Sequence, residues 1–187
     1  MNDIAQDIAS RKGKRVEFMS AGLNDHVMND EFAKKISTIA VQLIRNSLAH
    51  GIETPAERIA LSKADKGTIK LTLTKRDNGH FELTLVDDGA GLNKAHIINK
   101  ALEQGIINPA KAKIMTIDDA IPLIFHPDLS TSNNIDEDSG QGMGMFLVRK
   151  IVQDSGGKIA VRTIKNNGIR FIISLPSTQT NAIPSAA

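Results

Sequence analysis

The sequence predicts an α/β two-layer sandwich, in which a mixed, mostly antiparallel sheet of about five strands carries helices on one face. Two stretches each contain two alternating apolar and polar runs joined by a turn, which is the pattern of a β-hairpin. A long stretch before the first hairpin carries apolar residues at helical spacing. The 187 residues suit one domain, so we expect residues 1–176 to form it and the small, polar residues 177–187 to form a disordered tail.

The first third of the chain predicts a helix, a strand and a second helix. Residues 2–12 are expected to form a short helix, and residues 15–20 a strand in which Val16 and Phe18 alternate with polar neighbours. From residue 31 to residue 50, apolar residues recur at intervals of three and four, as on one buried helical face. Gly51 can end this longest helix in the left-handed conformation.

The next segment predicts a short helix followed by a hairpin. Thr54, Pro55 and Glu57 supply an N-cap, a proline at the first helical position and a capping box, so a helix should run from Pro55 to about Ala64. Residues 68–75 and 80–87 then alternate between apolar and polar side chains. The Asn-Gly pair at 78–79 is typical of the turn between two antiparallel strands.

The last part of the chain predicts helices around a long polar stretch and ends with a second hairpin. Asn93 can cap a helix that ends at Gly105, and another short helix can begin at Thr116. Residues 126–141 lack periodicity, as is typical of a lid or a binding loop. The expected elements after that stretch are a helix over 142–155, strands over 158–164 and 169–175, and a fold that ends at Pro176. The buried face of the helix after Asn93 is expected to contain Ala95, Ile98, Ala101 and Leu102.

The composition excludes several classes of function. There are 23 Lys and Arg residues against 21 Asp and Glu, so the net charge of +2 gives no reason to expect nucleic acid as a partner. The absence of cysteine excludes disulfides, thiol nucleophiles and cysteine-bound metals. No apolar run approaches the roughly 20 residues that a membrane span needs, and the N-terminus does not resemble a signal peptide. We therefore expect a cytoplasmic protein without membrane insertion.

The first candidate site lies in the long helix, in the segment LIRNSLAHGIE. Helical spacing places Gln42, Asn46 and the edge formed by Ala49 and His50 on the side opposite the apolar stripe. An asparagine oxygen is a hard ligand that suits Mg²⁺, which keeps several waters and bridges to phosphates. The alternative is an ordinary solvated helix face.

The second candidate site is the segment VDDGAGL at the end of a predicted strand. Gly89 and Gly91 would let the backbone approach a ligand closely. The carboxylate of Asp87 could accept a hydrogen bond from an exocyclic amine such as that of adenine. The alternative is a plain turn, because Asp and Gly are common turn residues.

The third candidate site is the segment SGQGMGMFLV. Gly140, Gly142 and Gly144 lead directly into a predicted helix, and amides at such a helix start favour phosphate. The segment does not follow a strand, so it fails the context of a Rossmann fingerprint, and no Gly-Lys-Ser/Thr follows as in a Walker P-loop.

In this order along the chain, the motifs resemble the ATP-binding (HATPase, Bergerat-fold) domain of the gyrase, heat-shock-90, histidine kinase and MutL superfamily. Within it they are most similar to the catalytic domain of CheA-type chemotaxis histidine kinases, over residues 2–176. The segment LIFHPDLST is similar to the phenylalanine-containing box of that family. The resemblance implies ATP and Mg²⁺ as cofactors, with Asn46 as the metal ligand. It implies nucleotide binding by Asn46, His50, Asp87, Gly89, Gly91, Ser130, Thr131, Gly140, Gly142, Met143, Gly144 and Met145.

Three positions depart from the family pattern. Gln42 stands where the family places a His or Glu that acts as a base or an orienting group, and glutamine cannot take up a proton. Ala49 replaces an Asp that follows the asparagine by three residues. Ile169 replaces the Thr of the last glycine box, which removes a hydroxyl near the base.

The resemblance leaves more than one function open. The main expectation is a CheA-like kinase domain that passes the γ-phosphate to a His on a separate phosphoacceptor domain, within a two-component pathway that contains a response regulator. Any dimerisation would come through domains absent from this sequence. The alternatives are a degenerate nucleotide-binding interaction module that does not transfer phosphate and a serine kinase like the anti-sigma factors. An ATP hydrolase is disfavoured because Gln42 and Ala49 remove the carboxylates that could activate water.

Overall fold

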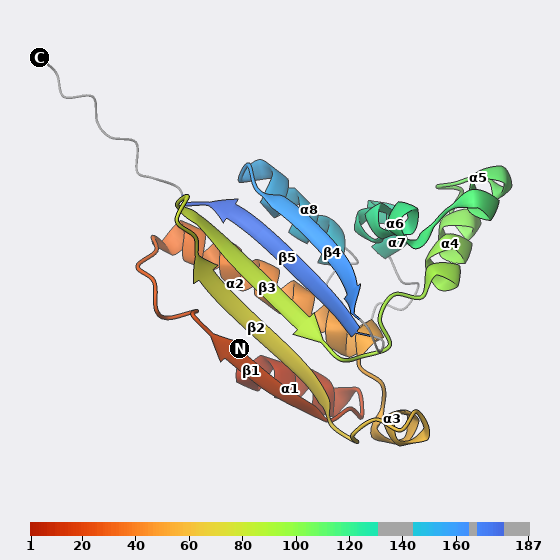
Figure 1. Cartoon of the computed structure of the whole chain (residues 1–187), viewed down its shortest axis with the longest axis horizontal. Coiled ribbons are helices and arrows are strands. Elements are labelled where there is room, and N and C mark those ends of the chain that lie inside the picture. The colour runs from red at the N-terminus through yellow and green to blue at the C-terminus, as the bar shows by residue number, and fades with distance from the viewer. Residues whose placement is uncertain (131–143, 165–167, 178–187) are drawn as a thin grey trace, which may run out of the picture.

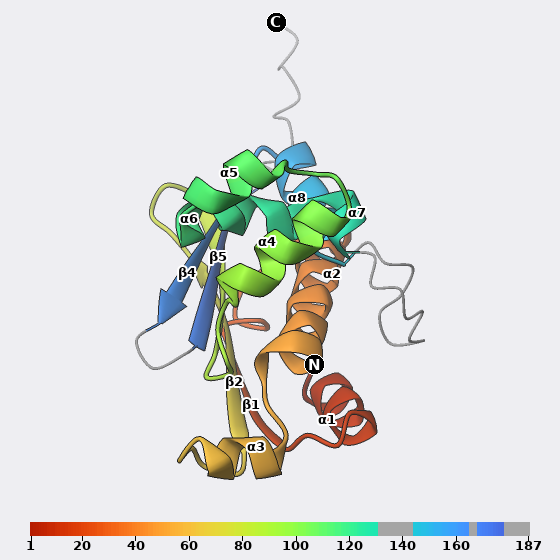
Figure 2. The same cartoon turned by 90° about the vertical axis from the view of Figure 1, so that its right-hand side faces the viewer.

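The computed structural model describes residues 1–130, 144–164 and 168–177. It contains a five-stranded sheet in the order β1-β2-β3-β5-β4, with helices α1, α2 and α8 packed on one face (Figures 1 and 2). This arrangement confirms the predicted two-layer sandwich. The strands are β1 (Val16–Ala21), β2 (Gly67–Lys75), β3 (His80–Asp87), β4 (Lys158–Ile164) and β5 (Gly168–Pro176).

The register of the sheet follows from the alternation of the strand sequences. Strands β1 and β2 run parallel, and the other three neighbouring pairs are antiparallel. In β3, Phe81, Leu83 and Leu85 are buried on the helix side of the sheet. Their register partners on β5 are the buried Leu175, Ile173 and Phe171. Because side chains along a strand point alternately to opposite faces, this pairing builds one apolar layer.

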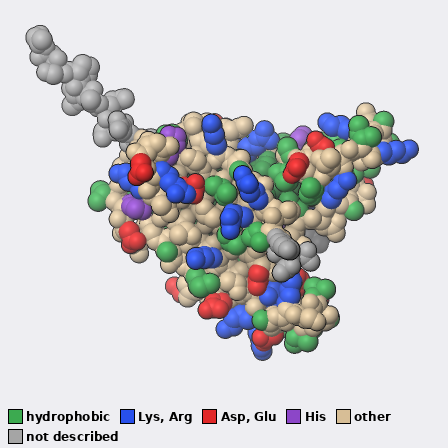
Figure 3. Space-filling model, in the orientation of Figure 1, with side chains coloured by type: hydrophobic (Ala, Val, Ile, Leu, Met, Phe, Trp, Pro, Cys, Tyr) green, Lys and Arg blue, Asp and Glu red, His purple; other side chains and the backbone are tan. Residues whose placement is uncertain are grey.

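The other face of the sheet is polar. Lys70 on β2 and Arg170 on β5 are exposed, and each is the register partner of Val86 on β3. Figure 3 views the molecule from this side and shows Lys and Arg side chains over the strands. Packing of the core therefore takes place on one face only, as in many antiparallel sheets.

Three amphipathic helices cover the apolar face. They are α1 (Asn2–Arg11), α2 (Asp30–Asn46) and α8 (Gly144–Asp154). The side chain of Asn29 caps α2 by accepting a hydrogen bond from the Phe32 amide at 2.8 Å. The stripe predicted for α2 is confirmed by its buried residues, which are Phe32, Ile36, Ile39, Ala40, Leu43 and Ile44.

The long helix does not run to residue 50 as a regular α-helix. The α-helical part ends at Asn46, and a π-helical turn, η1 (Ser47–Gly51), follows. The Ile52 amide donates to the Ser47 carbonyl oxygen at 2.7 Å, which closes a wider ring than an α-helical turn. Single π-turns are often found at functional sites, and this one borders the cavity described below.

The short helix α3 (Pro55–Ala60) begins as predicted but ends earlier. Thr54 and Glu57 form the expected capping box, and Pro55 occupies the first helical turn. The helix stops four residues before Ala64 because the chain turns back after Leu61, with Ser62 in the left-handed region at a φ of 58°. Arg58 on this helix is almost completely buried.

Short helices between β3 and α8 form a second, smaller apolar cluster beside the main core. They are α4 (Lys94–Glu103), α5 (Pro109–Ile114), α6 (Ile117–Ala120), η2 (Ile121–Phe125) and α7 (Pro127–Ser130). The caps at Asn93 and Thr116 are confirmed. The buried residues of α4 are Ile97, Ile98 and Ala101, so the expectation that Ala95 is buried was wrong.

The long polar stretch that was predicted over residues 126–141 begins with helix rather than loop, because α7 occupies 127–130. The remainder of that stretch lies outside the described residues. The same holds for 178–187 of the predicted tail. In the ranges that the structure describes, no helix is long and apolar enough to cross a membrane.

Candidate functional site

An open cavity of about 440 Å³ lies at one end of the helix layer, where α2, η1, α4 and the first turn of α8 meet the turn after β3. Its volume falls in the range of about 300–1,000 Å³ that is common for small-molecule sites. All three sequence motifs contribute described residues to it, the third through Gly144 and Met145 at the start of α8. The predicted site residues that line the cavity are Gln42, Asn46, His50, Asp87, Gly91, Gly144 and Met145.

Asp87 reaches the cavity because it continues the inward row of β3. The alternation that buries Leu83 and Leu85 also turns Asp87 toward the helices, and its side chain is 1% exposed. Its Oδ2 accepts a hydrogen bond from the Ser47 hydroxyl at 2.6 Å, and its Oδ1 accepts one from the Gly89 amide at 3.1 Å. The backbone amide of Ile169 is a further donor. Two carboxylate oxygens offer about four acceptor positions, so one remains for a ligand.

Burial raises the pKa of the Asp87 carboxyl above its ordinary value. The hydrogen bonds from Ser47, Gly89 and Ile169 act in the opposite direction because they favour the ionised form. A buried carboxylate that is held by three donors and still borders a cavity is well placed to recognise a donor on a ligand.

Ser47 is a site residue that sequence reasoning missed. Its spacing placed it on the apolar stripe of the long helix, and the structure does bury it. A buried hydroxyl needs a hydrogen-bond partner, and here the partner is Asp87 on a different element. The sequence feature that could have identified Ser47 is its hydroxyl group, which stands one position after Asn46 on an otherwise apolar helix face.

The turn after β3 packs directly against the end of η1. A Cβ atom on Gly89 would lie well inside van der Waals contact with the carbonyl group of Gly51, so only glycine fits there. The Ala90 amide donates to that same carbonyl oxygen at 2.8 Å. Gly91 has a φ of 72°, in the region that favours glycine. The two glycines are therefore required by geometry, and they hold Asp87 close to Ser47.

The polar side of α2 and of the following π-turn η1 faces the same cavity. Gln42, Asn46 and His50 all line it, which fits a functional helix face better than a solvated one. A Cβ on Gly144 would lie 3.3 Å from Gln42 Oε1, so the glutamine stands next to the start of α8. Ala49 and Ile169, the other two departures from the family pattern, also line the cavity.

Basic side chains surround the cavity. Lys12 directly after α1, Arg45 on α2 and Lys100 on α4 line it together with His96. Among the described residues, Arg45 Nε is buried and has no hydrogen-bond partner, which leaves a donor for a ligand. This concentration of positive charge favours an anionic ligand, although the whole chain is nearly neutral.

His50 is less basic than an ordinary histidine. Partial removal from water lowers its pKa, and the positive charges of Lys100 and Lys14 lower it further. The folded protein therefore binds a proton at His50 less readily than the unfolded chain does. The stability that depends on neutral His50 is present above the ordinary histidine pKa of about 6.5 and is lost as the pH falls below it.

We expect the His50→Gln variant to lose less stability on acidification than the wild type. Glutamine keeps the size and polarity of the side chain but has no proton to gain. Urea unfolding followed by circular dichroism at a series of pH values from about 7.5 to 5.5, which span the ordinary histidine pKa, measures the effect. Equal slopes of unfolding free energy against pH for the two proteins would contradict this assignment.

The residues present fit a magnesium site only if water and ligand phosphates supply most of the coordination. In the parts of the chain that the structure describes, no group of three His, Cys, Asp or Glu side chains could hold a metal. Asn46 offers one amide oxygen on the cavity wall. Mg²⁺ bound to nucleotides commonly keeps several waters and takes one or two protein ligands, so this donor set is compatible with it.

Several predicted site residues lie outside what the structure describes. They are Thr131, Gly140, Gly142, Met143 and the side chain of Ser130. Gly89 is not part of the cavity wall but donates its amide to Asp87. Met145 is buried in the main core and also borders the cavity.

The fold and the cavity are those of a small-molecule-binding domain, and the sequence comparison gives its family. The chain belongs to the family described as "Histidine kinase-, DNA gyrase B-, and HSP90-like ATPase", whose sequence profile matches residues 33–179. This confirms the resemblance seen in the sequence motifs.

Among curated proteins, the chain is similar to chemotaxis protein CheA from several organisms. It is 35% identical over 178 residues to the CheA of Rhizobium meliloti, which covers 95% of this chain and 23% of that protein. It is 35% identical over 168 residues to the CheA of Bacillus subtilis, which covers 88% of this chain and 24% of that protein. The chain thus spans about a quarter of the length of these relatives.

Solved structures share the fold at low sequence identity. The histidine kinase domain of a blue-light activated histidine kinase from Erythrobacter litoralis has a TM-score of 0.55 and 19% identity, and the match covers 95% of this chain and 63% of that one. The catalytic domain of histidine kinase ThkA has a TM-score of 0.51 and 18% identity, with 95% of each chain covered. At this level of identity, these matches support the fold alone.

Proposed function

We propose that this chain is the ATP-binding catalytic domain of a CheA-like histidine kinase. In this proposal it binds Mg-ATP and passes the γ-phosphate to a histidine on a separate phosphoacceptor domain, which serves a response-regulator pathway. The observation that carries the proposal is the buried carboxylate of Asp87, which shares one cavity with Asn46 and a set of basic side chains.

Asp87 is proposed to recognise adenine. The carboxylate already accepts hydrogen bonds from Ser47, Gly89 and Ile169, which fix its orientation. The remaining acceptor position can receive the N–H of the exocyclic amine at C6 of the base. Because the carboxylate is buried, a base without that amine would leave it poorly paired, and such mismatches give strong discrimination.

The basic side of the cavity is proposed to hold the triphosphate. Lys12 directly after α1, Arg45 on α2 and Lys100 on α4 line that side. Asn46 would hold the magnesium ion through its amide oxygen. A bound Mg²⁺ would neutralise charge on the β- and γ-phosphates.

Phosphate transfer on this chain would depend on positioning rather than on a protein base. In the transfer, the bond from the γ-phosphorus to the bridging oxygen of ADP breaks, and a bond to the imidazole nitrogen of the acceptor forms. The ring N–H proton is released to solvent. A neutral imidazole is nucleophilic, so the step tolerates Gln42, which can orient the reacting groups as a hydrogen-bond donor.

A second candidate is a nucleotide-binding module that does not transfer phosphate. Gln42 occupies the position at which the family pattern has a His or Glu, and it lies next to Gly144 at the start of α8. Ala49 and Ile169 also replace polar residues on the cavity wall. These substitutions favour a domain that binds nucleotide and controls a partner. The third candidate is serine phosphorylation, as in anti-sigma-factor kinases. The transfer assay described below distinguishes it from histidine phosphorylation.

Two measurements test the proposal. Titration calorimetry with ATP and ADP, with and without Mg²⁺, measures binding directly, since the chain has no Trp or Tyr for intrinsic fluorescence. Incubation with γ-labelled ATP and a separate histidine phosphoacceptor domain then tests transfer. Acid-labile label on that domain supports the kinase, and acid-stable label indicates serine phosphorylation. ATP binding without transfer supports the second candidate, and no binding at millimolar ATP contradicts all three.

We expect Asn46→Ala to remove the dependence of ATP affinity on magnesium. Mutating even a residue that only supports a metal ligand typically costs about 10–100-fold in metal affinity, so loss of the ligand itself should cost about tenfold or more. Calorimetry with and without Mg²⁺ measures this loss. Asn99→Ala is a matched control, because Asn99 is exposed on α4 and does not line the cavity. An Asn46→Ala variant with the magnesium response of the wild type would show that Asn46 does not hold the metal.

A further inference from the structure

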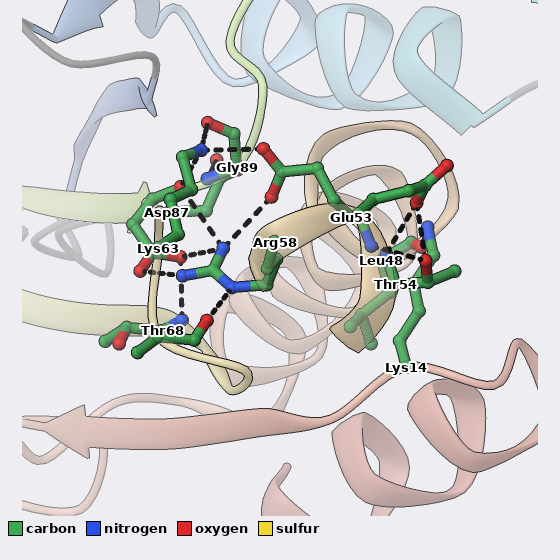
Figure 4. A network of polar contacts seen from close by, with 12 residues as sticks. Lys14, Leu48, Glu53, Thr54, Arg58, Lys63, Thr68, Asp87 and Gly89 are labelled. Atoms are coloured by element: carbon green, nitrogen blue, oxygen red, sulfur yellow. Dashed lines mark hydrogen bonds and ion pairs between the residues drawn. The ribbon is translucent and has the colours of Figure 1, made fainter. Parts of the chain in front are cut away.

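A buried arginine lies behind the turn that carries Asp87. The side chain of Arg58 is 2% exposed and is the largest fully buried side chain among the described residues. Its Nη1 donates to Glu53 Oε2 at 3.0 Å and to Asp88 Oδ1 at 3.2 Å, and its Nη2 donates to Asp88 Oδ2 at 2.9 Å. The third nitrogen, Nε, donates to the Ala64 carbonyl oxygen at 2.6 Å. Figure 4 shows Arg58 at the centre of these contacts.

A second cation completes the network. Lys63 Nζ donates to Glu53 Oε1 at 2.6 Å and to the backbone carbonyl oxygens of Asp88 and Gly89 at 2.9 and 3.0 Å. Asp88 Oδ1 also accepts from the Thr68 amide at 2.8 Å, at the start of β2. Two carboxylates are thus matched by two cations, and both oxygens of each carboxylate are used.

The network joins the two segments that form the base-binding end of the cavity. Glu53 follows the π-turn η1, two residues after Gly51. Asp88 is the chain neighbour of Asp87 and begins the glycine turn. Consecutive residues at a strand end point to opposite sides, so Asp87 faces the cavity while Asp88 faces Arg58. A rigid hold on Asp88 therefore fixes the backbone from which the Asp87 carboxylate projects.

We propose that Arg58 is a positioning residue for base recognition. Its bidentate contact to Asp88 and its single hydrogen bond to Glu53 hold the two carboxylates together. This sets the distance between η1 and the glycine turn, and therefore the position of the Asp87 carboxylate beside Ser47. This inference rests on the proposed function of Asp87 in binding adenine. Arginine suits the role because its planar group holds two carboxylates at fixed angles, which a lysine cannot do.

The alternative is that the network serves stability alone. A buried ion pair is weak evidence for net stabilisation, since the cost of desolvating the charges can offset their attraction. The contacts to the Asp88 and Gly89 backbone, made by Lys63 within the same network, point instead to control of the turn's conformation. A purely stabilising network would leave the base preference of the folded protein unchanged when it is broken, whereas a positioning role predicts that the preference falls.

The experiment compares ATP with inosine triphosphate, which carries an oxygen in place of the C6 amine. Calorimetry on the folded chain gives the ratio of the two affinities for the wild type, Arg58→Lys, Asp88→Asn and the double variant. We expect each single variant to reduce the preference for ATP by about tenfold, which corresponds to about 1.4 kcal/mol. The double variant should lose little more than one single variant, because both changes break the same contact.

Asp65→Asn is the matched control, because Asp65 also pairs with an arginine, Arg15 at 2.8 Å, but on the exposed surface away from the cavity. It should keep the wild-type ratio. Circular dichroism establishes the folded fraction, and Asp88→Asn, whose side chain is partly exposed, serves if Arg58→Lys does not fold. A wild type that does not bind ATP would contradict the proposed function. A wild type that prefers ATP, with an unchanged ratio in the folded variants, would overturn only the role of Arg58.

Discussion

Replacing Asp87 with asparagine is expected to weaken ATP binding by about 30- to 100-fold, the loss expected for one charge-assisted hydrogen bond. The asparagine would present an NH₂ group to a site where Ser47 and Gly89 already donate hydrogen bonds. It would therefore turn or shift and lose the alignment that receives the adenine amine. Calorimetry with ATP and with inosine triphosphate measures the change, and the preference between the two should nearly disappear.

Inorganic triphosphate is the internal reference for this variant. Its binding should be almost unchanged, because the basic residues of the cavity lie on other elements. Asp154→Asn on the exposed side of α8 is the matched substitution and should leave both affinities alone. If Asp87→Asn kept the wild-type preference for ATP, the carboxylate would have no part in reading the base.

The Gly89→Ala variant is expected to lose both stability and nucleotide binding. The added methyl group would meet the backbone of Gly51 and Ile52, which cannot move without disturbing η1. Overpacking of this kind costs about 1–3 kcal/mol. The turn would also move away from η1 and lose the hydrogen bond from the Ala90 amide to the Gly51 carbonyl. Urea unfolding and ATP titration of the same sample measure the two losses.

Gly79→Ala separates the two effects. Gly79 has a φ of 79° in the β2–β3 turn at the far end of the sheet, and the nearest atom to an added Cβ would be 3.7 Å away. This control should lose about 1–2 kcal/mol of stability through backbone strain while keeping ATP affinity. If Gly89→Ala bound ATP like Gly79→Ala, the close packing of the turn on η1 would not matter for the site.

The sequence was a good guide to elements that are stabilised by local chemistry. The span of β3 over 80–87, the caps at Asn93 and Thr116 and the capping box at Thr54 were all predicted correctly. Each depends on residues within a few positions of one another. The same alternation that identified β3 also placed Asp87 on the buried side, so the main site residue could be read from the strand pattern. Helix α5 was missed although Asn108 and Pro109 carry the usual start signal.

Features that depend on distant contacts could not be predicted. The π-turn η1 begins where a regular helix was expected, and it is packed against the glycine turn after β3. The amphipathic pattern of α3 gives no sign that Arg58 is buried, because its partner Asp88 comes from the end of another strand. The spacing of Ser47 places it in an apolar stripe, and only the three-dimensional structure shows that its hydroxyl donates to Asp87. In each case the missing information was the pairing of segments far apart in the chain.

The same pairing has a consequence for how the domain folds. Asp87 and Ile169 are register partners on β3 and β5, and the intervening chain contains α4, the short helices and α8. The two local hairpins, β2–β3 and β4–β5, can form early, because closing a short loop costs little entropy. The cavity is complete only when the two hairpins join edge to edge and α2 docks across them. A ligand in this cavity therefore distinguishes the native protein from partly folded forms and stabilises only the former.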